Sequence, residues 1–127
     1  MRYLGLLVLV SVLPVRASST APITVEMTEF AFRPAMIRVS AGRSVTLRLI
    51  NRGQIAHQFV TDVLRTRPVI VTNSRIYVET PGLDVLRLQP GESATLTFTA
   101  GQRGRFPFAC TIEGHRERGM EGVLEVR

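Results

Sequence analysis

The chain has 127 residues, a single cysteine and a formal net charge of +6. This length fits one domain with a hydrophobic core of its own. The basic residues are all arginines that stand singly among acidic residues, so the charge does not indicate nucleic-acid binding. One cysteine excludes a disulfide within the chain, so the thiol is free, paired between chains or used for something else, such as binding a metal.

The N-terminus has the three parts of a secretory signal peptide. Arg2 supplies a positive charge, and residues 3–15 form a predominantly apolar run. In the segment Val15-Arg16-Ala17, Val15 is apolar and Ala17 is small, which suits cleavage. The apolar run is too short to span a membrane as a helix. We therefore expect residues 1–17 to be a signal peptide and the protein to be exported to the periplasm or another extracytoplasmic space. The alternative is an uncleaved hydrophobic tether.

Residues 18–127 form a succession of short segments with the pattern of β-strands, which we expect to build one domain. Val45, Leu47 and Leu49 alternate with polar residues, which is the period of two expected of a half-buried strand. The other predicted strands lie at residues 23–30, 36–40, 57–60, 94–98, 106–110 and 123–126. Turn residues stand at 41–43, 51–53, 90–91 and 101–104.

No window of useful length has a helical period. Many short strands separated by Gly and Pro residues indicate an all-β fold, either a sandwich or a barrel of the Greek-key kind. Residues 61–88 are the least regular part, where the segments 69–71, 75–78 and 85–88 are either edge strands or parts of one long excursion. Neither an internal repeat nor a linker marks a second domain.

The strand predicted at 106–110 leads into a loop that carries three soft or borderline metal ligands. Cys110, His115 and Met120 follow one another at intervals of five residues. Two histidines and a cysteine with a weak axial methionine form the pattern of an electron-transfer copper site. The chain has one further histidine, His57, which begins a predicted strand directly after a turn. The copper prediction therefore depends on whether His57 reaches the loop.

Each of these residues also has an ordinary structural explanation. A lone buried cysteine is usually a small hydrophobic residue, a methionine usually fills a core, and a histidine often lies on the surface. Their joint presence in one glycine-containing loop favours copper. Met27 and Met36 are candidates for a second soft site that would bind copper(I), but their positions in strands favour core packing.

Several short motifs follow one another along the chain. They are EFAFRP at residues 29–34, VSAG at 39–42, Asn51-x-Gly53-x-x-x-His57, LQPGE at 88–92 and FACTIEGHRERGMEGVLEV at 108–126. In this order they resemble the cupredoxins, or blue copper proteins, over nearly the whole of residues 18–127. The resemblance implies a Greek-key β-sandwich that holds one type 1 copper ion, with His57, Cys110, His115 and Met120 as its ligands.

The chain departs from familiar cupredoxins in the ligand loop and beside the early histidine. The spacing from Cys110 to His115 is two residues longer than in plastocyanin, and that from His115 to Met120 is one longer than in azurin. Gln58 stands where plastocyanin has an asparagine. These differences leave the copper prediction in place, whereas the spectrum, the potential and the hydrogen bond made by residue 58 stay open.

The resemblance implies a one-electron carrier that cycles between copper(II) and copper(I). A methionine at Met120 predicts a fairly positive potential, and the exposed edge of His115 would be the electron port. We expect a monomer that docks transiently with a cytochrome or with a copper oxidase or reductase. Protein donors fill all four coordination positions, so we do not expect an enzyme. The alternative function is copper delivery, storage or tolerance.

Overall fold

The structure is a computed structural model that describes residues 21–127. The predicted signal peptide, residues 1–17, lies outside the described residues. Among the described residues, no helix has the length and apolar character needed to cross a membrane.

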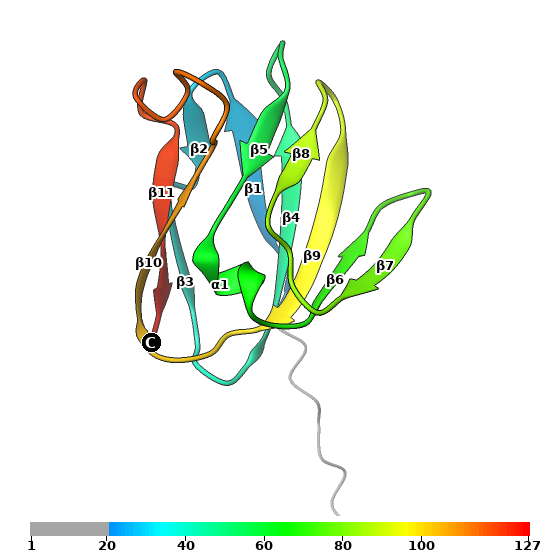
Figure 1. The fold of residues 1–127 in the computed structure, drawn as a ribbon, viewed down its shortest axis with the longest axis vertical. Coiled ribbons are helices and arrows are strands. Elements are labelled where there is room, and N and C mark those ends of the chain that lie inside the picture. The colour runs from blue at the N-terminus through cyan, green and yellow to red at the C-terminus, as the bar shows by residue number, and fades with distance from the viewer. Residues whose placement is uncertain (1–20) are drawn as a thin grey trace, which may run out of the picture.

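The described part of the chain is almost entirely β-structure, as the alternating sequence pattern predicts (Figure 1). It contains eleven strands and one helix of four residues. In chain order these are β1 (Ile23–Thr28), β2 (Ala31–Arg33), β3 (Met36–Val39), β4 (Ser44–Asn51), β5 (His57–Phe59), α1 (Asp62–Arg65), β6 (Val69–Thr72), β7 (Tyr77–Thr80), β8 (Leu86–Leu88), β9 (Ser93–Thr99), β10 (Gly104–Ala109) and β11 (Glu121–Val126).

The strands form a β-sandwich, which confirms the predicted fold class. The largest sheet has six strands in the order β2-β1-β4-β9-β6-β7, and the others have the orders β10-β11-β3 and β5-β8. The pairs β1–β4 and β11–β3 are parallel, and the other strand pairs are antiparallel. The resulting order places strands that are distant in sequence side by side, which brings the ligand-bearing loops to one end.

The predicted alternation in β4 places its apolar side chains in the core. Val45, Leu47 and Leu49 are buried, and Leu47 lies opposite Leu96 of β9 in the register of the two strands. Burying apolar surface in this way is the main favourable contribution to folding. Met27 of β1 belongs to the same buried cluster, as its strand position predicted.

Three phenylalanines from different strands join the sheets beneath the ligand loops. The ring of Phe32 in β2 makes edge-to-face contacts with Phe59 of β5 and Phe108 of β10, at centroid distances of 5.9 and 5.1 Å. Aromatic rings prefer this geometry because the positive edge of one ring faces the negative face of the other. All three side chains are buried, so the site rests on a closely packed floor.

Two local predictions need correction. The strand predicted at 23–30 ends at Thr28, and Glu29 and Phe30 form a two-residue turn that leads into β2. The short helix α1 was not expected, because four residues are too few to show a helical period. The segments proposed as edge strands within 61–88 are strands, with small shifts, namely β6, β7 and β8. β7 lies at the edge of the six-stranded sheet, whereas β6 lies inside it between β9 and β7. The β6–β7 hairpin projects from the side of the sandwich (Figure 1).

Candidate metal centre

The predicted ligands come together at the end of the sandwich where the β4–β5 and β10–β11 loops lie (Figure 1). Two backbone hydrogen bonds of 3.0 Å join Val60, just after β5, to Ala109 at the end of β10. Because His57 begins β5 and Cys110 directly follows β10, this bridge holds both residues at the same end. The expectation that these two strands lie side by side is confirmed.

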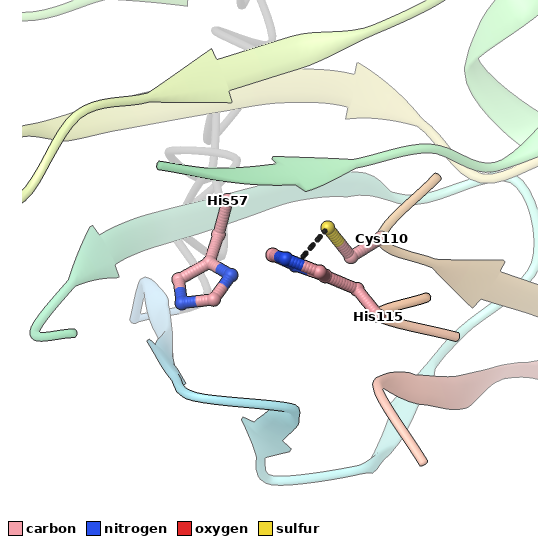
Figure 2. Close-up of side chains that lie close together, drawn as sticks. All are labelled: His57, Cys110 and His115. Carbon is pink, nitrogen blue, oxygen red and sulfur yellow. Dashed lines mark hydrogen bonds between the residues drawn. The ribbon is translucent and has the colours of Figure 1, made fainter. Parts of the chain in front are cut away.

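Three of the four predicted ligands face one another in a compact cluster. One ligating atom from each of His57, Cys110 and His115 lies within 4.8 Å of the others, and Figure 2 shows the three side chains pointing into the same space. The Sγ atom of Cys110 is 3.4 Å from Nδ1 of His115. His57 and Cys110 are fully buried and His115 is 7% exposed, so the cluster is shielded from solvent.

The donor atoms fit a metal ion. Nδ1 of His57 is buried and has no hydrogen-bond partner among the described residues. A buried polar atom without a partner costs free energy, and a metal ion bound at this nitrogen would remove that cost. Two imidazoles and one thiolate form the trigonal donor set of a type 1 copper site.

Met120 lies at the end of the same loop and is fully buried. Its backbone closes the loop, because its carbonyl accepts a hydrogen bond from the Cys110 amide at 3.0 Å and its amide donates to the His115 carbonyl at 3.1 Å. Gly119 makes the final turn with a φ of 100°, a backbone conformation that residues with a side chain rarely adopt. The loop therefore holds Cys110, His115 and Met120 in a fixed mutual arrangement.

Gln58, which directly follows His57, forms hydrogen bonds with Cys110 and with the next residue, Thr111. Its backbone amide donates a hydrogen bond to Sγ of Cys110 at 3.3 Å, and its side-chain Oε1 accepts one from the Thr111 hydroxyl at 2.6 Å. The side chain of Gln58 therefore makes a hydrogen bond at the position where plastocyanin has an asparagine. Hydrogen bonds to the sulfur are among the features that set the potential of such sites.

Asn51 shapes the turn that precedes His57. This side chain is fully buried, and its amide nitrogen donates to the carbonyls of Ile55 at 2.8 Å and Leu88 at 2.9 Å. Its Oδ1 accepts a hydrogen bond from the Gly53 amide at 2.9 Å. Asn51 thus holds both the turn and the neighbouring strand β8 in place beside His57.

The β1–β2 turn also contacts the site, which the sequence did not predict. Oε1 of Glu29 accepts a hydrogen bond from the Gln54 amide at 2.7 Å and lies 3.3 Å from Nε2 of His57. The Gln54 hydrogen bond is the main reason why the pKa of Glu29 is lowered from its usual value. Phe30 lies edge-on to His115, with ring centroids 5.1 Å apart, and the Arg118 guanidinium covers the Phe30 ring at 4.7 Å.

The surroundings of His115 favour its neutral form, which is the form that binds metals. Burial lowers the pKa of its imidazole, and the nearby His57 and Arg118 lower it further by charge repulsion. A neutral imidazole has a free lone pair on one ring nitrogen, which is the form that binds metals. The ring therefore needs little proton loss before binding at neutral pH.

A family model described as "Cupredoxin-like domain" matches residues 2–85, about two thirds of the chain, including His57. The chain belongs to this cupredoxin family. Copper is the cofactor of this cupredoxin. The family match and the fold are accompanied by a histidine–cysteine–histidine cluster, which is the donor set that copper prefers. The matched range ends before Cys110, so the evidence for the loop ligands is the geometry described above.

Two curated relatives are copper-resistant cuproproteins named CopI. The cupredoxin is 33% identical to the protein of Rubrivivax gelatinosus over 98 residues, which cover 76% of this chain and 59% of the relative. It is 28% identical to the protein of Pseudomonas aeruginosa over 143 aligned positions, which cover 87% of this chain and 78% of the relative. The chain thus spans somewhat over half the length of the first relative.

Solved structures share the fold at low sequence identity. Reduced auracyanin from Roseiflexus castenholzii is 20% identical with a TM-score of 0.60, and the match covers 87% of this chain and 99% of that one. A multicopper oxidase from Pediococcus acidilactici is 15% identical with a TM-score of 0.72, over 94% of this chain and 29% of the oxidase. The cupredoxin therefore has a fold that makes up nearly the whole of auracyanin and one part of a larger multicopper oxidase.

Proposed function

We propose that this cupredoxin is an exported one-electron carrier with a single type 1 copper site. The proposed ligands are Nδ1 of His57, Sγ of Cys110, an imidazole nitrogen of His115 and the thioether of Met120. The observation that supports this assignment best is that donor atoms of His57, Cys110 and His115 already lie within 4.8 Å of one another in a buried position. Bound copper supplies a couple between copper(II) and copper(I).

The surroundings of the ligands favour electron transfer because they restrict movement. Three features limit how far the donor atoms can shift. They are the backbone hydrogen bonds of the loop, the hydrogen bond from the Gln58 amide to the sulfur, and the packed phenylalanines beneath the site. A site that changes little between two oxidation states transfers electrons with little rearrangement. Burial also excludes water, which strengthens the influence of nearby dipoles on the potential.

We propose that the protein is not itself an enzyme. The four proposed donors would fill the coordination positions of a single ion, and a catalytic metal site needs an open position for substrate. The chain has only two histidines, and the proposed site uses both. A second copper centre of the kind that reacts with substrates would require further ligands of this type.

The proposed partner is a redox protein, such as a cytochrome or a copper oxidase or reductase, that docks transiently near His115. Transient electron-transfer complexes typically have small interfaces, and we expect the cupredoxin to remain a monomer. The charges on the ligand loop nearly balance, since Glu113 and Glu117 stand beside Arg116 and Arg118. Charge alone therefore does not select one partner.

A second candidate function is copper delivery, storage or tolerance. It is favoured by the two relatives named as copper-resistant cuproproteins. The two functions make different demands on the site. A carrier must keep its copper through many redox cycles, whereas a delivery protein must pass copper to an acceptor, mainly as copper(I).

Repeated redox cycling in the presence of a copper(I) chelator separates the two functions. The copper-loaded protein is reduced and reoxidised with small-molecule reagents, and the copper captured by the chelator is measured after each cycle. A carrier retains its copper and exchanges electrons rapidly with a cytochrome from the same source in stopped-flow experiments. Loss of most of the copper within the first reductions, with slow electron exchange, would overturn the carrier proposal and support delivery.

A further inference from the structure

The two-residue turn between β1 and β2 contacts both histidines of the site. Glu29 lies against His57 and Phe30 lies against His115. We propose that Glu29 is a positioning residue, whose carboxylate accepts a hydrogen bond from Nε2 of His57 and thereby keeps Nδ1 free and directed at the metal. This inference rests on the proposed role of His57 as a copper ligand.

The hydrogen bonding of His57 supports a single tautomer. A neutral imidazole carries its proton on one of its two ring nitrogens. Nε2 is 3.3 Å from Oε1 of Glu29, whereas Nδ1 is buried without a partner among the described residues. A carboxylate is an acceptor only, so it favours the proton on Nε2 and leaves the lone pair on Nδ1 for a metal.

The Glu29 carboxylate is itself held in place by the loop that leads into His57. Its Oε1 atom accepts hydrogen bonds from the amides of Gln54 at 2.7 Å and Ile55 at 3.4 Å. These amides belong to the β4–β5 loop, while Glu29 comes from the β1–β2 turn. The carboxylate therefore joins two loops and has a fixed position from which to orient the His57 ring.

Gly53 provides independent evidence that this contact is close. A Cβ atom at Gly53 would lie 2.3 Å from Oε1 of Glu29 and 2.9 Å from Nε2 of His57. Real Cβ atoms essentially never approach other atoms more closely than 3.0 Å. The loop thus leaves room for the carboxylate and the imidazole to meet only because residue 53 has no side chain.

One residue of the turn has an energetically unfavourable backbone conformation. Phe30 has a φ of 63°, in the left-handed region that residues with large side chains rarely adopt. Such strained residues persist where the surrounding structure holds them and are common at functional sites. Here the conformation places Phe30 beside His115 and its neighbour Glu29 beside His57.

The tautomer of His57 in the metal-free protein tests the proposal directly. Long-range proton–nitrogen correlation spectra distinguish a proton on Nε2 from one on Nδ1. We expect the wild-type protein to carry it on Nε2, Glu29→Ala to show a mixture, and Glu29→Gln to restore much of the wild-type state because an amide oxygen also accepts. Glu26→Gln is the matched control, since Glu26 lies in β1, the strand that leads into the turn, and pairs with Arg52 instead.

Copper binding supplies the second readout. Removing such an outer hydrogen-bond partner typically lowers metal affinity by about 10- to 100-fold. We expect a loss of this size in Glu29→Ala, a smaller loss in Glu29→Gln and none in Glu26→Gln, measured by competition with a copper(II) chelator. Glu29→Gln keeps the shape of the side chain, so it tests the proposal even where the alanine variant does not fold.

The outcomes separate this inference from the proposed function. A wild-type protein with the proton on Nδ1, or a Glu29→Ala variant with unchanged tautomer and copper affinity, would overturn the positioning role. If the wild-type protein carries the proton on Nε2 but forms no thiolate–copper bond, the proposed function fails and the effect of Glu29 on the ring still stands.

Discussion

Each donor atom of the copper site has a neighbour that limits where it can point. The Cys110 sulfur accepts a hydrogen bond from the Gln58 amide, and His57 lies against the Glu29 carboxylate. Met120 is tied to the loop through its backbone and packs in the core cluster. At the scale of single residues, the site is therefore defined by the ligands together with the groups that hold them.

The axial role proposed for Met120 predicts the effect of a substitution on the potential. The Met120→Gln variant should have a lower reduction potential than the wild type, because an amide oxygen stabilises copper(II) relative to copper(I) better than a thioether does. Spectroelectrochemical titration measures the change, with Met36→Leu as a control in β3. An unchanged or higher potential in Met120→Gln would contradict the assignment of Met120 as a ligand.

Asn51 predicts a loss of stability without a change of ligand. The Asn51→Ala variant removes the partners of the Ile55 and Leu88 carbonyls, and leaving a buried polar group unsatisfied costs about 1–3 kcal/mol. Urea unfolding of the metal-free protein should show a decrease of this size in the free energy of unfolding. The same substitution at Asn73, in the exposed β6–β7 hairpin, should cost clearly less, and equal costs would contradict this account.

The convergence of His57, Cys110 and His115 was predictable from the sequence, whereas the role of Glu29 was not. The loop spacing, the scarcity of histidines and the cupredoxin motifs all pointed to the same residues. Glu29 and His57 are 28 positions apart, and a glutamate at a turn is most often an exposed residue. Only the pairing of β1 with β4 brings the β1–β2 turn to the early histidine.

At the scale of elements, β11 is the middle strand of the three-stranded sheet β10-β11-β3. Glu125 in β11 forms ion pairs with Arg38 of β3, Arg105 of β10 and the neighbouring Arg127. The hydrogen bond from Arg127 is the largest cause of the lowered pKa of Glu125, and the charges of the other arginines lower it further. This carboxylate therefore stabilises the fold in its ionised form.

The lowered pKa of Glu125 predicts the direction of a pH effect. In the unfolded chain the carboxyl group has its ordinary pKa of about 4.5, so below that value the unfolded state takes up the proton first. The contribution of Glu125 to stability is complete above this pH and decreases as the pH falls through the folded-state pKa. Urea unfolding should show the wild type more stable than Glu125→Gln at neutral pH and the difference shrinking in acid. A difference that grows in acid would contradict the prediction.

The sequence predicted individual strands better than their ends and partners. The alternation in β4 and β9 identified both strands, since a buried face requires a period of two. The end of β1 was misplaced because Phe30 continues an apolar pattern, although its backbone leaves the strand. The parallel pairing of β1 with β4 depends on contacts across the whole sheet, and alternation within one strand contains no information about its neighbour.

At the scale of the whole molecule, the ligand end links separate sheets. His57 belongs to the β5–β8 pair, while Cys110, His115 and Met120 belong to the connection between β10 and β11. A metal that binds these residues together binds only the folded chain. Binding should therefore stabilise the entire domain by mass action.

Copper(II) at about 100 times its dissociation constant should raise the free energy of unfolding by about 2.7 kcal/mol. Thermal unfolding with and without copper(II) measures this effect, and His115→Ala should lose most of the stabilisation because one donor is missing. Equal stabilisation of the wild type and His115→Ala would show that copper binds elsewhere on the protein.

The visible absorption of the copper(II)-loaded protein tests the central claim, that His57 and the sulfur-bearing loop hold one copper ion together. We expect an intense thiolate-to-copper band in the orange-red, which disappears in Cys110→Ser and weakens or shifts in His57→Ala, while circular dichroism shows the β-fold intact. A wild-type protein without this band, or a band that persists in Cys110→Ser, would contradict the account.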